Sequence, residues 1–442
     1  MSNEPMSIRR RTFLAIVSAS SAVIAGSFLH RPDDKRDHTA EPLMTIDQVY
    51  QITEQYYIGP KQERPPANEA EGTIWEVTDA NQIGGTQRTL SDGERWVTLN
   101  IEPDALNSSI RPGEYYLTPN DGIEGIQRVI DRTGGNVVIR LAPGTYAGSE
   151  LTLAHGVMLQ GSGYNATKIK LKDGANTDLI TTPDPPKRNV MACTLQNITF
   201  DGNKKNNSAG NVVYGAFWNS RFINCGFHSA PEAGFWLAGS VASTDDNHFT
   251  GCQFTTNEGV GLRGGANKES HPAVGVVRVD TNWFGHNGGP AIVARGNSWK
   301  ITNSKLYHNA SERGASIELD RCSYATVSGC DSYLGRTDRD HITVRASKGV
   351  NSVGNQIKNN DFRGEYRSAV RCLADADEIT ALQVHGNTIQ NSANAIGGII
   401  TRTENGGSFA NCSFKDNIFT STMAGSKINL SAGWVSVGNL NA

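Results

Sequence analysis

The chain has 442 residues, of which 37% are hydrophobic and 19% are charged, and its formal net charge is −3. This length exceeds what one hydrophobic core usually organises, so it predicts several domains or one elongated stack of repeats. The nearly balanced charge excludes a strongly basic nucleic-acid-binding protein, and we expect no nucleic-acid partner.

The first segment, residues 1–30, resembles a twin-arginine export signal. Arg10 and Arg11 are followed by Thr12-Phe13-Leu14, and the stretch Thr12–Leu29 contains no charged residue. The resemblance implies export by the twin-arginine route to an extracellular or cell-surface location. A stretch of this length can just span a bilayer, so it would anchor the protein in a membrane if it stayed uncleaved. We expect no other contact with a membrane.

Two short regions come next. Residues 31–64 predict a linker, charged and proline-containing at its start, and a short helix that Met44–Ile58 fits only loosely. Residues 65–114 predict a small β module, because two runs of alternating apolar and polar residues lie on either side of the turn formers Ser91, Asp92 and Gly93.

A repeated signature dominates the rest of the chain. It has six positions: apolar, any residue, small or polar, small or polar, any residue, apolar. Nine copies begin at Leu195, Phe222, Phe249, Val279, Ile301, Val327, Ile357, Val384 and Phe414. All nine first positions and eight of the nine sixth positions are apolar; at the exception, Ser332, we expect Tyr333 to take the inward place after a shift of one residue. A fixed motif with a spacer of variable length is typical of a solenoid.

The start of the solenoid carries the more specific pattern. Residues 120–135 have isoleucines at helical spacing between an Asn-Asp start and a Gly-Gly stop, which predicts a helix that caps the open end of the stack. A β run, Pro143-Gly144-Thr145-Tyr146 and Gly161-Ser162-Gly163 follow. Together these features resemble the pectate-lyase superfamily of right-handed parallel β-helices. The resemblance implies an all-β fold over residues 115–442, with about ten coils. It does not identify an activity, since the superfamily contains lyases, hydrolases, epimerases and tail spikes.

In such a fold each coil has three strands, and the signature covers the second strand, a tight turn and the third strand. The turn position holds Asn282, Asn360, Asn387 and Asn417 in different coils, and Cys225, Cys252 and Cys330 in others. We interpret the asparagines as a hydrogen-bonded ladder. The cysteines predict buried thiols, and their spacing favours neither disulfides nor a zinc site.

The first strand of each coil presents a face outward. Alternation places six residues inward: Ile317, Leu319, Ile342, Val344, Val370 and Cys372. The outward residues then form columns across the coils. One predicted column is Trp236, Gly261, Val293, Glu318, Thr343 and Arg371; a second is Ala238, Arg263, Arg295, Asp320, Arg345 and Leu373; a third ends with Ser316, His341 and Ala369.

The resemblance makes this face the substrate groove. The candidate catalytic residues are His341, Arg345, Arg371, Glu318 and Asp320. The candidate substrate-binding residues are Arg263, Arg295, Trp236, Arg367 and Tyr366. A ladder of alternating charges that keeps an exposed sheet soluble accounts for Arg295, Asp320 and Arg345 equally well.

Arginines on an open groove suit an acidic polysaccharide, because a guanidinium pairs bidentately with a carboxylate. We therefore predict a polyuronate substrate cleaved by β-elimination. Glu318, Asp320 and Asp338 could hold a Ca²⁺ ion that neutralises the uronate, and His341, Arg345 or Arg371 could remove the adjacent proton.

Two alternatives remain open. Glu318 and Asp320 lie two residues apart on a strand, about 6.7 Å at Cα, which is close to the carboxylate separation of inverting glycoside hydrolases. The second alternative is a non-catalytic protein that binds glycan or serves as a structural or adhesive element at the cell surface.

Overall fold

The computed structural model describes residues 56–59, 74–77, 87–91 and 96–99, and residues 113–441 except 186, 240–243, 266–273, 391–394, 396 and 421–427. The chain divides into two compact units, Met1–Tyr115 and Tyr116–Ala442. The predicted export signal lies outside the described residues. Within them, no helix is long and apolar enough to cross a membrane.

The first unit contains a four-stranded sheet. Its strands, in spatial order, are β1 (Tyr56–Gly59), β2 (Ile74–Val77), β3 (Gln87–Ser91) and β4 (Trp96–Leu99). β1 and β2 are parallel, and the two later pairs are antiparallel. Since β1 begins at Tyr56, the predicted helix over Met44–Ile58 is wrong at its end; its earlier residues lie outside the described part.

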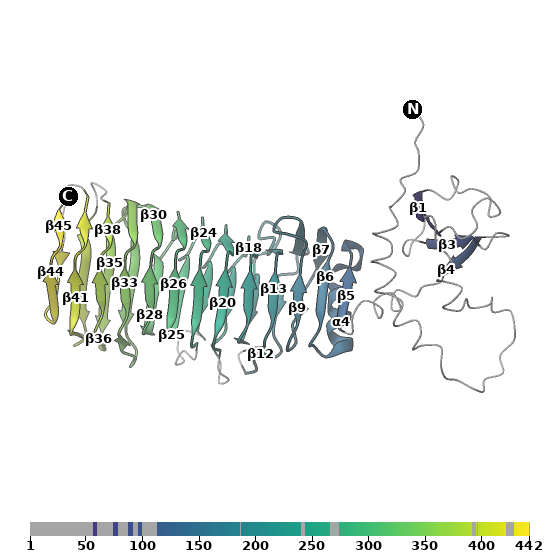
Figure 1. Ribbon diagram of the computed structural model, residues 1–442. Helices are drawn as coiled ribbons and strands as arrows, with labels where there is room; N and C mark the ends of the chain where they lie inside the picture. The colour runs from purple at the N-terminus through teal and green to yellow at the C-terminus, as the bar shows by residue number, and fades with distance from the viewer. Residues whose placement is uncertain are drawn as a thin grey trace, which may run out of the picture. The chain divides into compact units, whose positions relative to one another are not determined.

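The second unit is a parallel β-solenoid, which confirms the predicted fold class (Figure 1). Three long sheets run along it, and each complete coil contributes one strand to each. Sheet 1 consists of β8 (Leu151–Thr152), β11 (Ile180–Thr181), β15 (Val213–Gly215), β19 (Phe235–Leu237), β22 (Leu262–Gly264), β25 (Ile292–Asn297), β28 (Ala315–Ser323), β31 (Asp340–Ala346), β35 (Ser368–Asp375), β39 (Gly397–Glu404) and β43 (Ile428–Asn429).

Sheet 2 consists of β5 (Glu114–Leu117), β6 (Val138–Leu141), β9 (Met158–Gln160), β13 (Thr194–Gln196), β17 (Arg221–Ile223), β20 (Asn247–Thr250), β23 (Val277–Asp280), β26 (Trp299–Thr302), β29 (Thr326–Ser328), β33 (Gln356–Lys358), β37 (Gln383–His385), β41 (Cys412–Lys415) and β44 (Trp434–Val437). Sheet 3 consists of β7 (Gly144–Gly148), β10 (Thr167–Leu171), β14 (Thr199–Asp201), β18 (Gly226–His228), β21 (Gln253–Thr255), β24 (Trp283–Gly285), β27 (Lys305–Tyr307), β30 (Asp331–Gly335), β34 (Asp361–Glu365), β38 (Thr388–Ile389), β42 (Ile418–Phe419) and β45 (Leu440–Asn441).

Two small sheets lie in the connections between coils. They pair β12 (Val190–Met191) with β16 (Phe217–Trp218), and β32 (Ser352–Val353) with β36 (Glu378–Thr380) and β40 (Ser408–Ala410). The repeated signature therefore corresponds to a sheet 2 strand, a turn and a sheet 3 strand, as predicted.

The predicted capping helix is α4 (Gly122–Thr133), preceded by the 3₁₀ turn η3 (Pro119–Asp121). Its apolar side, which includes Ile123, Ile126 and Ile130, is buried. Gly134 ends the helix in the left-handed region, at φ 67°, where a side chain would be strained. The helix lies at the same end of the solenoid as β5 and β7 (Figure 1) and covers apolar residues of the first coil.

The core is a column of aligned apolar side chains. Four sixth-position phenylalanines stack ring on ring between successive coils, with centroid separations of 5.5, 5.0 and 4.6 Å for Phe200–Phe227, Phe227–Phe254 and Phe254–Phe284. Stacking of identical residues holds the coils in register, and register is what makes the outward residues neighbours.

The asparagine ladder is also confirmed. Asn360 Nδ2 donates to Asn387 Oδ1 at 3.0 Å, and Asn387 Nδ2 donates to Asn417 Oδ1 at 2.9 Å. Asn282 Oδ1 accepts the backbone N–H of Cys252 at 2.7 Å. Cys225, Cys252 and Cys330 are buried, as predicted, and each thiol donates to a backbone carbonyl.

The exception in the repeat has a different explanation from the predicted one-residue shift. Ser332 is 2% exposed and lies in register with Leu306 and Phe362, whereas Tyr333 is 37% exposed. The shift is therefore wrong: a serine occupies the inward position, and its partner is described below.

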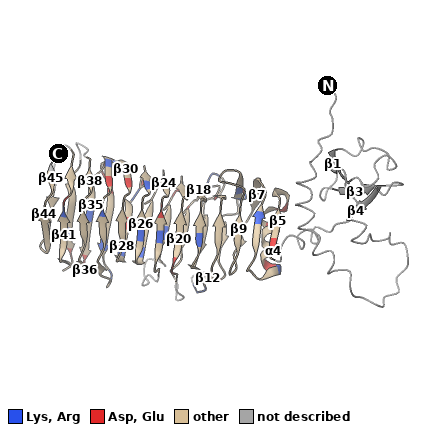
Figure 2. Cartoon of the chain, viewed as in Figure 1, with Lys and Arg blue, Asp and Glu red and all other residues tan. Residues whose placement is uncertain are grey.

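Charged side chains are spread along the solenoid among a majority of uncharged residues (Figure 2). The described part of the solenoid surface therefore has no large patch of a single charge sign. Whether a charged side chain can bind a ligand depends on whether it is already paired with another side chain.

Candidate functional site

The outer face of sheet 1 carries most of the predicted site residues. The six residues predicted to point inward are at most 1% exposed. Strand register places an outward row in the order Tyr214, Trp236, Arg263, Val293, Glu318, Thr343 and Arg371. Five strand spacings separate Trp236 from Arg371, about 24 Å along the solenoid.

The register corrects one position in the predicted columns. Arg263, rather than Gly261, lies opposite Trp236, so Arg263 belongs to the Trp236–Glu318 row and not to the row of Arg295. Its guanidinium lies over the Trp236 ring, 4.4 Å from the centroid. The Trp236 indole is fixed by donating to the carbonyl of Gly265 at 2.9 Å. This arrangement holds a cation flat against the sheet.

Arg263 is poorly compensated. Its Nε is buried without a hydrogen-bond partner, and no described carboxylate forms an ion pair with it. Burial and the nearby charge of Arg295 lower the pKa of its guanidinium. Asp320 and Glu318 attract this guanidinium without contacting it. A half-buried cation that forms no ion pair with a described carboxylate is suited to binding an anionic ligand.

Glu318 stands in the middle of the row. It is half-buried, its Oε1 accepts the backbone N–H of Ala315 at 3.3 Å, and burial raises the pKa of its carboxyl. Arg295 and Arg345 oppose that increase in pKa by attracting the carboxylate. A carboxyl with a raised pKa on an open face is a candidate for proton transfer near neutral pH.

The second row combines a fixed ion pair with a free arginine. Arg295 Nε and Nη2 both contact Asp320 Oδ2, at 2.8 and 2.7 Å, and the two side chains are only 11% and 14% exposed. Asp320 also lies 3.5 Å from Arg321 Nε. Arg345, in register with Asp320, is exposed and makes no ion pair with a described carboxylate. The charge-ladder interpretation therefore describes Arg295 and Asp320, while Arg345 remains available to a ligand.

A buried carboxylate that sequence reasoning did not select organises the far end of the face. Asp340 is 1% exposed; it accepts from Arg367 Nε at 2.9 Å and from Ser368 Oγ at 2.6 Å, and Arg371 Nη1 lies 3.9 Å away. The hydrogen bond to Asp340 raises the pKa of Arg367, whereas burial and Arg367 lower that of Arg371. The sequence signal for Asp340 was its position directly before His341, in the segment that leads into the strand of Arg345.

Two predicted site residues lie in the core. His341 is 0% exposed; its Nδ1 is 2.8 Å from Ser332 Oγ, and its ring packs against Phe362 and Tyr366. Tyr366 is likewise 0% exposed and donates to the carbonyl of Gln390 at 3.0 Å. The predicted outward orientation of His341 is wrong, and neither side chain can contact a ligand on the outer face of sheet 1.

The reason lies at the start of the sheet 1 strands. Ser316, His341 and Ala369 are the second residues of β28, β31 and β35, and each is fully buried together with the residues on either side of it. Strict alternation fails there because two consecutive side chains both point into the core.

The three predicted calcium ligands do not fit a shared site. Asp320 is engaged by Arg295, and Asp338 is exposed on the preceding turn, 3.3 Å from Arg336 Nε. Among the described residues there is no group of three or more His, Cys, Asp or Glu side chains that could hold a metal ion. Calcium binding stays a prediction, and we derive no step from it.

A trough adjoins the Trp236 end of the row. It has a volume of about 300 Å³, with a buried floor that includes Ala233 and Val260 and with Trp236 and Arg263 on one side. The exposed Glu258 lies on its rim, together with Glu232 and Glu312. We call this feature the sheet 1 trough. The three glutamates of the rim could not be predicted from the sequence. They lie in the turns between sheet 3 and sheet 1, which the repeated signature does not cover.

A glycine keeps the turns beneath this rim close together. A Cβ at Gly259 would lie 2.5 Å from the carbonyl oxygen of Glu232, so a larger residue would separate the two turns.

Substitution of Asp340 tests how firmly this end of the face is organised. Asp340→Asn should lower the free energy of unfolding by about 2 kcal/mol, because two arginines lose a shared counter-ion while keeping partial access to water. Asp375→Asn, at the other end of β35, is the matched control and should cost less than about 0.5 kcal/mol. Urea unfolding of the variants measures both. Equal stability of the two variants would show that Asp340 has no organising role.

No protein-family model matches the chain, and no curated protein matches it in sequence. Solved structures do share its fold. The A-module of the mannuronan C-5 epimerase AlgE4 from Azotobacter vinelandii is 19% identical, with a TM-score of 0.52 over 73% of this chain and 99% of that chain. The catalytic unit of a GH87 α-1,3-glucanase from Streptomyces thermodiastaticus is 14% identical, with a TM-score of 0.54 over 74% of this chain and 68% of that chain.

A third structure with this fold is PfbA, a surface adhesin of Streptococcus pneumoniae. It is 14% identical, with a TM-score of 0.56 over 74% of this chain and 90% of that chain. At these identities the likeness concerns the fold alone: the chain is similar to parallel β-solenoid proteins.

Proposed function

We propose that this protein is a carbohydrate-active member of the pectate-lyase superfamily that binds an acidic polysaccharide along the outer face of sheet 1 and cleaves it by β-elimination. One observation carries the proposal: Arg263, Arg345 and Arg371 line the face that holds Glu318, a carboxyl with a raised pKa. Two of the solved structures with this fold are described as a mannuronan epimerase and a glucanase, which supports a sugar polymer as the ligand.

The elimination assigns separate tasks to these groups. Arg345 and Arg371 hold the uronate carboxylate and make the neighbouring C5–H more acidic. Glu318 accepts the C5 proton, the electron pair forms the C4–C5 double bond, and the C4–O glycosidic bond breaks. The departing oxygen takes a proton from water. Because Glu318 must be ionised, its raised pKa makes the rate fall as the pH drops through that pKa.

His341 has no part in this mechanism, since it lies in the core. In this mechanism Arg345 and Arg371, rather than a calcium ion, neutralise the carboxylate of the uronate.

Hydrolysis remains the closest rival. It would use Glu318 as the general acid and Asp320 as the base. Asp320 is fixed by two contacts from Arg295, which favours a structural role for that carboxylate. We also propose that the twin-arginine segment directs the export of the protein. Export would bring it to the outside of the cell, where polysaccharides of this kind are found.

The test is an incubation of the full chain with pectate, alginate and other polyuronates, with and without Ca²⁺. We expect ultraviolet absorbance from unsaturated sugar ends, at a rate that Arg345→Ala lowers at least tenfold. New reducing ends without that absorbance would identify a hydrolase, and inverted C5 stereochemistry without cleavage would identify an epimerase. Binding with no reaction would leave a glycan-binding protein. Each of these three results overturns elimination.

A further inference from the structure

A second hollow lies on the turn beside the sheet 1 trough. It has a volume of about 560 Å³ and is lined by Lys204, Lys205, Asn206 and Ser208, from the turn between β14 and β15, together with Asn176 and Glu258. We call it the turn hollow. Pro231 and Glu258 line both the turn hollow and the trough, so the two are adjacent and meet at these residues.

The turn that builds this hollow is longer than its neighbours and is held rigidly. Residues 202–212 connect β14 to β15, whereas the equivalent turns one, two and three coils later span 229–234, 256–261 and 286–291. Asn207 is buried; its Nδ2 donates to the carbonyl of Lys172 at 3.1 Å, and its Oδ1 accepts from the backbone of Asn176 at 3.0 Å. Ser208 N donates to Asn176 Oδ1 at 2.8 Å. A fixed turn can present side chains without an ordering cost on binding.

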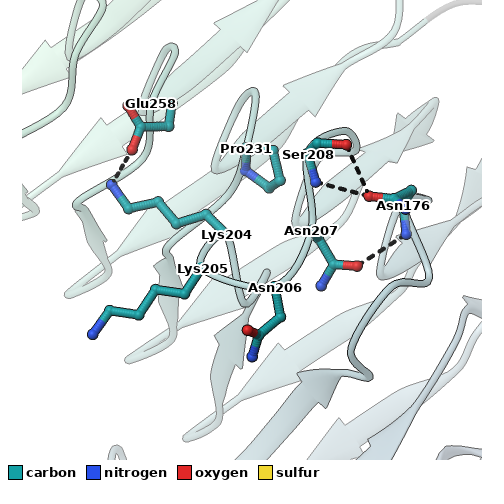
Figure 3. A pocket seen from close by; sticks show the side chains of 8 residues that line it. All are labelled: Asn176, Lys204, Lys205, Asn206, Asn207, Ser208, Pro231 and Glu258. Atoms are coloured by element: carbon teal, nitrogen blue, oxygen red, sulfur yellow. Dashed lines mark hydrogen bonds and ion pairs between the residues drawn. The ribbon is translucent and has the colours of Figure 1, made fainter.

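The two lysines differ in their partners. Lys204 Nζ contacts Glu258 Oε1 at 2.6 Å, across the boundary between the hollow and the trough (Figure 3). Lys205 extends beside it, exposed and without an ion pair to any carboxylate of the described chain (Figure 3). Glu258 is thus neutralised, and the hollow retains the positive charge of Lys205. Three other acids also contact this turn: Asp173 accepts from Asn206 Nδ2 at 3.0 Å, Asp178 accepts from Asn211 Nδ2 at 2.8 Å, and Asp201 accepts from the backbone N–H of Asn203 at 2.9 Å.

We propose that the turn hollow is an additional subsite for a carboxylate-bearing sugar residue, which an acidic glycan reaches after passing from Glu318 through the sheet 1 trough. Arg263 and Arg313 line the trough together with Glu232 and Glu312, and its apolar floor suits the C–H face of a sugar. The hollow supplies Lys205 and amide groups. Four strand spacings, about 19 Å, separate the β15 coil from Glu318. Only a long oligosaccharide bound at Glu318 therefore reaches Lys205. This inference rests on the proposed function.

Equilibrium binding of fluorescently labelled oligouronates, as trimers and as decamers, tests the subsite. The protein is the full chain carrying Glu318→Gln in every arm, so that bound oligomers are not consumed. Lys205→Ala should weaken decamer binding about fivefold at low salt, and Lys205→Glu should weaken it further. Neither should change trimer binding. Lys300→Ala, which removes an exposed lysine from β26 in sheet 2, is the matched control and should change nothing.

The outcomes separate the two proposals. If trimers bind but decamers bind equally well with and without Lys205, the subsite is wrong and the sheet 1 site stands. Equal weakening of trimers and decamers would show a general electrostatic effect and would also overturn the subsite. Absence of binding by any oligouronate would overturn both proposals.

Discussion

Glu318→Gln is expected to lower the rate of polyuronate cleavage by about 10²- to 10⁴-fold, the usual contribution of a positioned proton-transfer group. Glutamine has nearly the same shape, and its carbonyl oxygen can keep the hydrogen bond from Ala315 N–H. The substitution therefore removes the basic oxygen while leaving β28 in place. Unsaturated ends formed per unit time measure the effect.

Glu404→Gln supplies the control, because Glu404 is a partly exposed carboxyl at the end of β39 on the same sheet, paired with Arg402 at 2.7 Å. It should turn over at the rate of the unmodified protein. The pH profile adds a second readout: the acid limb should sit above the ordinary range of a glutamate, since burial raises the pKa of Glu318. Full activity in Glu318→Gln would assign the proton transfer to another group, with Arg371 as the next candidate.

The repeats made the fold predictable from sequence. Nearly every coil buries apolar residues at the first and sixth positions of the signature, and Phe200, Phe227, Phe254 and Phe284 stack because the coils are parallel and in register. The turn asparagines could be assigned for the same reason. A buried amide needs partners, and the next coil offers an identical one.

The site was less predictable, because it depends on places where the repeat changes. Arg263 was assigned to the wrong row, because the turn before β22 places the strand two residues away from its expected register. Side chains alternate with a period of two, so an error of two residues leaves the predicted outward face unchanged. His341 was expected outside because strict alternation put it in an outward column, and Tyr366 because it lies in the turn that precedes the strand of Arg371. Here the small Ser332 leaves room in the core that the imidazole fills.

Pairing was the other missing information. The sequence places Arg295, Asp320 and Arg345 in one column, and only coordinates show that Asp320 contacts Arg295 while Arg345 is exposed. Whether a charged side chain is available to a ligand depends on its contacts with opposite charges within about 4 Å. Strand periodicity predicts the column of a residue but not such contacts.

His341 should make the solenoid sensitive to acid. Burial lowers the pKa of its imidazole from 6.5 to about 3, so the folded chain keeps it neutral. The unfolded chain takes up a proton below its ordinary pKa of about 6.5, and below that pH the unfolded state binds more protons than the folded state. Stability is therefore present above pH 6.5 and is lost as the pH falls towards about 3.

The size of the loss follows from the displaced pKa. At about 1.4 kcal/mol for each pKa unit, lowering the pH from 7 to 4.5 should cost the folded state roughly 3 kcal/mol through this one group. His341→Gln removes the titration and retains a partner for the Ser332 hydroxyl. It should unfold more readily at pH 7, because the ring contacts with Phe362 and Tyr366 are lost, yet lose less stability on acidification.

Urea midpoints at the two pH values measure the difference, with His385→Gln as the control, since His385 lies partly exposed on sheet 2. That control should show the full acid loss of the unmodified protein. Parallel behaviour of His341→Gln and the unmodified chain would mean that the imidazole is accessible to protons in the folded state. In that case His341 could also take part in chemistry on the outer face of sheet 1, because its neutral state and its exclusion from that face depend on the same burial.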